Sequence, residues 1–120
     1  MAALTENAIT KLSTTVAVDM KTAANTLIYT VPTGKSLLIT HVIVRTNTAS
    51  LASGTSYSVT NFVQTFSLTA MTTTTGYRII HAADNTTYVI STTGTAINWT
   101  VTTGSALACT AVIELYGVLF

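Results

Sequence analysis

Charged side chains are scarce in this sequence, and their scarcity excludes several kinds of function. The chain of 120 residues carries five Lys or Arg and four Asp or Glu, 8% in all, whereas an ordinary globular domain carries about 25%. The cations are scattered rather than grouped, so we expect no binding to nucleic acid. No apolar stretch reaches the length of a transmembrane helix, about 18 residues, and residues 1–11 lack the features of a secretory signal. We therefore expect no membrane partner.

Cysteine and proline are almost absent as well. Cys109 is the only cysteine, so an intrachain disulfide and a cysteine-based zinc site are both excluded. Its neighbours form an apolar, strand-like run, which predicts a buried, inert thiol. The chain is nevertheless long enough to bury the core of one domain without such cross-links.

Hydroxyl side chains take the place of the missing charges. The sequence contains 28 Thr and 9 Ser, while 48% of its residues are hydrophobic. Threonine and the other β-branched residues favour strands over helices. A surface coated by hydroxyls with few charges is unusual for a free monomer and suits a protein that packs against copies of itself or a larger shell.

The pattern of turns and alternating apolar residues predicts an all-β fold. We expect an N-terminal arm over residues 1–13, then one domain over residues 14–120 with about eight strands in a jelly-roll-like antiparallel β-sandwich. The turn Pro32-Thr33-Gly34-Lys35 separates two of these strands. The strands are predicted at residues 14–18, 26–31, 36–46, 55–63, 65–71, 77–81, 87–91, 96–102 and 106–116, and residues 117–120 are expected to form a tail.

The predicted strand at residues 36–46 is apolar on both faces, unlike the others. Because a two-layer sandwich buries one face of each sheet, the second apolar face suggests a contact between subunits. The alternation assigns a possible subunit interface to the side chains of Leu37, Ile39, His41, Ile43 and Arg45. A core or edge histidine with a local hydrogen bond is the alternative for His41.

No constellation of residues in the sequence points to catalysis. His81 and Asp84 lie in one turn, but a general base or metal there needs a nucleophile or further ligands. Ser67 and Ser91 are nominal nucleophiles in a chain rich in hydroxyls. We therefore expect no enzyme activity, no cofactor and no metal site.

Aromatic side chains offer one further kind of site. Trp99 alternates with polar neighbours, which favours a place in the core. If it were exposed, it could line a sugar-binding surface with Tyr57, Tyr77 and Tyr88.

The run at residues 28–44, with its strand, Pro-x-Gly-Lys turn and second strand, resembles a hairpin near the start of many small bacteriophage virion proteins. The resemblance implies a jelly-roll subunit located in the virion, at the capsid surface or in a tail or fibre. The leading hypothesis is a non-enzymatic, homotrimeric capsid decoration (cement) protein whose partners are its own copies and the major capsid protein or another virion protein. The alternative is a fibre or tail adhesin, or a carbohydrate-binding β-sandwich module.

Overall fold

The computed structural model describes residues 8–60, 65–74, 76–81, 89–90 and 93–120, and all regular elements within them are β-strands. This confirms the all-β fold class. The strands are β1 (Thr10–Asp19), β2 (Asn25–Thr30), β3 (Leu37–Arg45), β4 (Ser56–Val59), β5 (Tyr77–His81), β6 (Val89–Ile90), β7 (Ala96–Thr103) and β8 (Thr110–Leu119).

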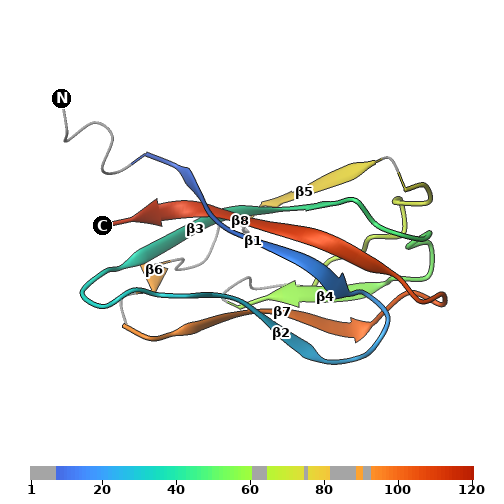
Figure 1. The fold of residues 1–120 in the computed structure, drawn as a ribbon, viewed down its shortest axis with the longest axis horizontal. Helices are drawn as coiled ribbons and strands as arrows, with labels where there is room; N and C mark the ends of the chain where they lie inside the picture. The colour runs from blue at the N-terminus through green and yellow to red at the C-terminus, as the bar shows by residue number, and fades with distance from the viewer. Residues whose placement is uncertain (1–7, 61–64, 75, 82–88, 91–92) are drawn as a thin grey trace.

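The strands form two antiparallel sheets that face each other as the layers of a sandwich (Figure 1). One sheet has the order β1-β8-β3-β5, and the short β6 also pairs with β3 beside β5. The other has the order β2-β7-β4. The predicted antiparallel β-sandwich is therefore confirmed.

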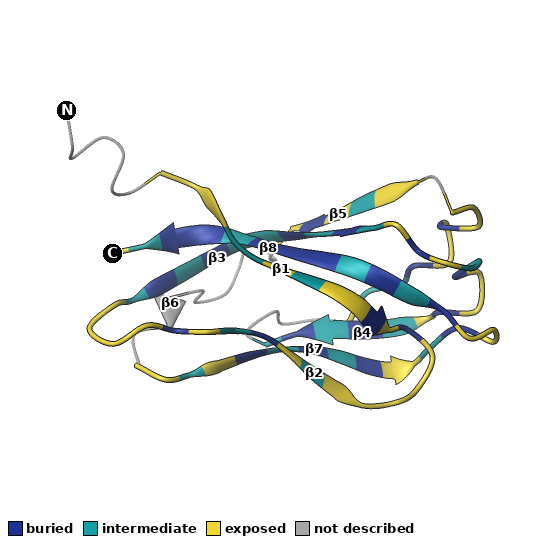
Figure 2. Cartoon of the chain, viewed as in Figure 1, coloured by how far each residue is buried: buried dark blue, intermediate teal, exposed yellow. Residues whose placement is uncertain are grey.

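The core lies between the sheets, where inward side chains of both layers meet (Figure 2). Trp99 and Tyr57 are both fully buried, which confirms the predicted core position of Trp99. The Tyr57 hydroxyl donates a hydrogen bond to the Met20 carbonyl oxygen at 2.9 Å, and burial is the main reason that its pKa rises to about 12. Cys109 is buried, as predicted.

β1 is longer than the sequence pattern indicated, and β8 is displaced toward the C-terminus by three to four residues relative to the predicted strand at residues 106–116. β1 begins at Thr10, inside the segment predicted as an arm, because Thr10 and Lys11 pair with Gly117 and Tyr116. β8 begins at Thr110 and runs to Leu119, so the expected tail is mostly strand. Its pairing with β1 on one side and β3 on the other supplies the hydrogen bonds that extend both ends.

The prediction of a strand at residues 65–71 is wrong. Phe66 makes an isolated bridge to Tyr57, and the chain then turns. Within the turn Ser67 Oγ accepts a hydrogen bond from the Thr69 backbone N–H, and Met71 N–H bonds to the Leu68 carbonyl. Local hydroxyl-to-backbone bonds of this kind compete with strand pairing.

Bulges interrupt two strands of the larger sheet. In β1 the register shifts between Lys11 and Ser13 and again between Thr15 and Val18, where Ala17 has a left-handed φ of 54°. In β3 the register against β8 shifts between Ile39 and His41. A one-residue shift reverses which face the following side chains occupy.

Candidate interaction surface

The larger sheet has a face turned away from the core that no described element covers (Figure 1). We call this the outer face. Residues directly opposite each other on paired strands lie on the same side of a sheet, so the pairings define its members. Its members are Lys11, Thr14, Leu38, His41, Ile43, Arg45, Tyr77, Ile79, His81, Val112, Glu114, Tyr116 and Val118.

The bulge in β3 divides the five residues predicted as a subunit interface. Leu37 and Ile39 are 0% and 2% exposed and belong to the core, so these two side chains are not available to another chain. Past the bulge, His41, Ile43 and Arg45 turn outward and are partly exposed. Their role as an interface stays a prediction.

Gly117 explains why the bulge forms at this point. A Cβ at Gly117 would collide with the Leu38 carbonyl oxygen, so the two strands approach closely there. The extra residue, Thr40, donates its hydroxyl hydrogen to the Tyr116 carbonyl oxygen at 3.2 Å. The missing side chain and this hydrogen bond together stabilise the reversal of faces.

An ion-pair cluster lies at the centre of the outer face. The Glu114 side chain is only 9% exposed, and its carboxylate accepts a hydrogen bond from Arg45 Nε at 2.9 Å. Lys11 Nζ lies 3.2 Å from the other carboxylate oxygen. The hydrogen bond from Arg45 is the main cause that lowers the pKa of Glu114 below its ordinary range, against the opposing effect of burial.

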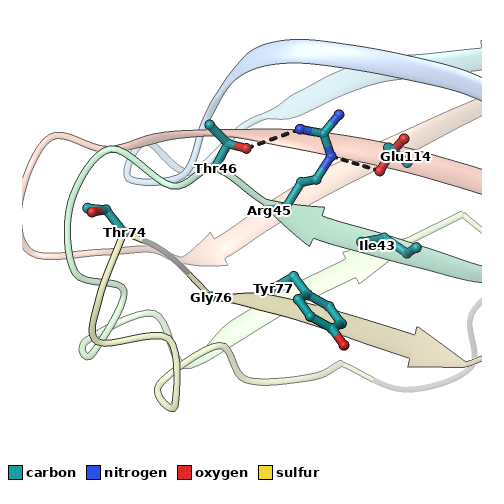
Figure 3. Close-up of a pocket in the computed structure, with 7 residues that line it drawn as sticks. All are labelled: Ile43, Arg45, Thr46, Thr74, Gly76, Tyr77 and Glu114. Carbon is teal, nitrogen blue, oxygen red and sulfur yellow. Dashed lines mark hydrogen bonds and ion pairs between the residues drawn. The ribbon is translucent and has the colours of Figure 1, made fainter.

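A shallow hollow of about 390 Å³ opens beside this cluster (Figure 3). The Arg45 guanidinium bridges Glu114 and the Thr46 hydroxyl on one side, and the Tyr77 ring stands on the neighbouring strand. Tyr77 is 69% exposed, so its ring is accessible to a partner. The lining residues are Ile43, Arg45, Thr46, Thr74, Gly76, Tyr77 and Glu114.

A row of three rings crosses the outer face at the other end of β5. The His41 ring stacks on Tyr116, with centroids 4.6 Å apart and planes 8° from parallel. On its other side lies His81, with centroids 5.6 Å apart. Burial, and secondarily the neighbouring His81, lowers the pKa of His41 below its ordinary value. The two histidines are 40 residues apart in the chain, so only strand pairing reveals their contact.

The solvent side of the smaller sheet has a different chemistry. Asn25 and Thr100 are hydrogen-bonded to each other there at 2.8 Å, and Ser58 pairs with Thr100 along the ladder. Leu27 is the large apolar side chain exposed on β2. Hydroxyl and amide groups therefore line this side of the smaller sheet, while rings, aliphatic groups and ion pairs gather on the outer face.

The remaining candidates from the sequence do not form a site. Asp84, Ser91 and Tyr88 lie outside the described residues. Ser67 Oγ donates to Thr69 Oγ1 at 3.0 Å and is far along the chain from both histidines. Within the described part of the chain, no three His, Cys, Asp or Glu side chains gather as a metal-binding group.

Membrane and family comparisons add two findings. Over the residues that the structure describes, there is no helix long and apolar enough to cross a membrane. The chain matches no protein-family model, and neither the curated proteins nor the solved structures yield a significant match.

Proposed function

We propose that this protein is a non-enzymatic structural subunit of a virion, which forms a homotrimer through its outer face and decorates the outer shell of a capsid. The observation that carries the proposal is the concentration of apolar and aromatic groups on one uncovered sheet face. Ile43, Tyr77 and Ile79 lie side by side on β3 and β5, and Tyr77 and Ile79 are 69% and 42% exposed. Apolar faces of this kind are typical of protein–protein contacts.

The size and charge of the whole surface support self-assembly rather than a monomeric protein. The monomer exposes 6276 Å², of which a standard interface would bury about 800 Å² per partner, roughly one eighth. Nine charged residues serve that whole surface, and the outer face contains three of them already paired as Arg45, Lys11 and Glu114. Because Glu114 is paired with both cations, a partner can cover the face without burying an unpaired carboxylate.

The topology supports the jelly-roll part of the proposal. The first four strands alternate between the two sheets, and the first and last strands, β1 and β8, are neighbours. Interleaving of this kind is expected when a long hairpin wraps into two sheets. The capsid location rests on the resemblance of residues 28–44 to the hairpin of phage virion proteins.

The test is the mass of the native particle in solution, measured by light scattering coupled to size exclusion. We expect three times the chain mass of 12.6 kDa. Ile79→Lys should dissociate the trimer, because it places a charge at the centre of the buried face. Leu27→Lys is the matched control, since Leu27 is 55% exposed on the other sheet, and this variant should remain trimeric.

Two outcomes would overturn the proposal at different levels. A concentration of about 50 μM is well above the dissociation constants of stable assemblies. If the wild-type protein is monomeric at that concentration, the homotrimer is excluded. A trimer that does not co-sediment with capsids of the virus that encodes it would remove the decoration role and leave the self-association in place.

Carbohydrate binding is a second candidate, favoured by the exposed Tyr77 ring beside the hollow. Aromatic faces flanked by polar groups such as Arg45 and Glu114 are suited to sugar rings. Trp99 and Tyr57 cannot take part, because both are fully buried. A glycan array should then show binding that Tyr77→Ala abolishes; an array without saturable binding would exclude this function.

A further inference from the structure

The two histidines of the chain lie directly opposite each other on β3 and β5. His41 pairs with His81 in the antiparallel ladder, and both side chains project from the outer face. Their ring centroids are 5.6 Å apart. When one tetrahedral ion binds two imidazoles with bonds of about 2.1 Å, the ring centroids lie about 5 Å apart. The observed separation is therefore close to that of two ligands sharing one ion.

Hydrogen bonding determines which nitrogen of His41 can bind a ligand. The single hydroxyl hydrogen of Thr40 is donated to the Tyr116 carbonyl oxygen. Thr40 Oγ1 can therefore only accept in its 3.0 Å contact with His41 Nδ1. This pair of contacts favours the tautomer with the ring proton on Nδ1 and the lone pair on Nε2. Metal-binding histidines are generally oriented in this way, by donation from the nitrogen that does not bind the metal.

The surroundings hold one ring in place and leave the other adjustable. Tyr116 stacks on His41 with planes 8° from parallel, which restricts rotation of the His41 ring. His81 is exposed at the last position of β5, so its ring can turn toward His41 without disturbing the core.

We propose that His41 and His81 together bind one divalent transition-metal ion of the Zn²⁺ or Cu²⁺ class, with His41 contributing Nε2. Imidazole ligands suit both ions. No third His, Cys, Asp or Glu joins the pair within the described residues, so water or a group from a docked molecule completes the coordination. This inference departs from the sequence-based expectation of no metal site, and it does not depend on the proposed role in a virion.

The test uses tag-free, full-length protein that has been dialysed against a chelator. Calorimetric titration with ZnCl₂ and separately with CuCl₂ should show one ion per chain, and NMR should show shifts of the imidazole protons of both histidines. His81→Ala removes one ligand at an exposed position and should weaken binding by more than about tenfold, at least the effect of losing a second-shell partner. Leu27→Ala, at an exposed position on the other sheet, is the control and should bind like wild type.

A second variant tests the orientation of His41. Thr40→Val removes the acceptor for Nδ1–H, and we expect binding to weaken by about tenfold. Imidazole ¹⁵N shifts should show the Nδ1–H tautomer in wild type and its loss in this variant. Absence of saturable binding by wild type, or equal binding by wild type and His81→Ala, would overturn the proposal. An Nε2–H tautomer in the wild-type protein would overturn the assignment of Nε2.

Discussion

The buried carboxylate of Glu114 allows a sharp test of the electrostatics of the outer face. Glu114→Gln preserves the size of the side chain and removes its charge. One oxygen can still accept from Arg45 Nε, now 2.9 Å from a carboxylate oxygen. The Gln amide nitrogen replaces the carboxylate oxygen that now lies 3.2 Å from Lys11 Nζ, so two hydrogen-bond donors face each other there. Hydrogen bonds to charged groups contribute about 1.5–3 kcal/mol, and exposed ion pairs such as that of Lys11 about 0–1 kcal/mol.

We expect Glu114→Gln to lower the free energy of unfolding by about 1–2 kcal/mol at pH 7, because one charged hydrogen bond is weakened rather than lost. The midpoint of thermal unfolding should fall by about 5 °C. Trp99 is the only tryptophan and is fully buried, so its fluorescence reports unfolding in urea. Protein concentration must be held constant, because assembly contributes to apparent stability.

The pH dependence separates this reasoning from a simple packing defect. The pKa of Glu114 is lower in the folded protein than its ordinary value of 4.5, so the unfolded chain binds the proton more tightly. The stabilisation is therefore complete above pH 4.5 and disappears as the pH falls through the folded pKa. The difference in stability between wild type and Glu114→Gln should therefore shrink as the pH is lowered from about 5 toward 2.5.

Two results would refute the argument about Glu114. One is equal stability of wild type and Glu114→Gln at pH 7, and the other is an equal loss at pH 7 and at pH 2.5. Arg45→Met supplies the control through a double-mutant cycle. If Arg45 is the main partner, the double variant should lose clearly less stability than the sum of the two single variants.

Three further predictions concern the backbone and the core. Gly117→Ala should lower the free energy of unfolding by about 1–3 kcal/mol, because its Cβ would meet the Leu38 carbonyl; Gly76→Ala, with no atom within 4 Å of the new Cβ, is the control and should be no less stable than wild type in urea. Tyr57→Phe should cost about 0.5–1.5 kcal/mol in the same assay, since the buried Met20 carbonyl oxygen loses one hydrogen bond and keeps the one from the Ser105 N–H; unchanged stability would contradict that role. Cys109 should react with a thiol-specific disulfide reagent only after unfolding, because it is 4% exposed; rapid labelling of the native protein would show that it is accessible.

Sequence patterns predicted the layers of this fold better than its irregularities. Alternation in β7 correctly placed Ile97, Trp99 and Val101 in the core, because burial alternates along this strand from Ala96 to Val101. The same rule failed in β3, where the bulge at Thr40 changes the phase within the strand. The prediction therefore placed Leu37 and Ile39 at a subunit interface, although both belong to the core. The cause lies in Gly117, 77 residues from Thr40, whose close approach to β3 no local pattern records.

The candidate site was hidden for a related reason. His41 was recognised as unusual because it interrupts an apolar strand, and Arg45 was grouped with it. Their partners His81 and Glu114 come from other strands, 40 and 69 residues away. Such pairings depend on the register between strands, which a single sequence does not specify when turns and loops vary in length. Composition could indicate a face that needs a partner, but not the residues that form it.

The kinked course of β1 has a consequence for how copies of this chain can associate. β1 is an edge strand of the larger sheet, and an edge with straight, unpaired N–H and C=O groups invites endless strand addition and amyloid-like fibres. The two register shifts and the left-handed Ala17 break that row of groups, and Lys11 adds a charge near its start. The edge is therefore a poor template for fibril growth. In a chain with only 8% charged residues, the irregular backbone of β1 thus supplies a protection against strand-to-strand aggregation that charge supplies in other proteins.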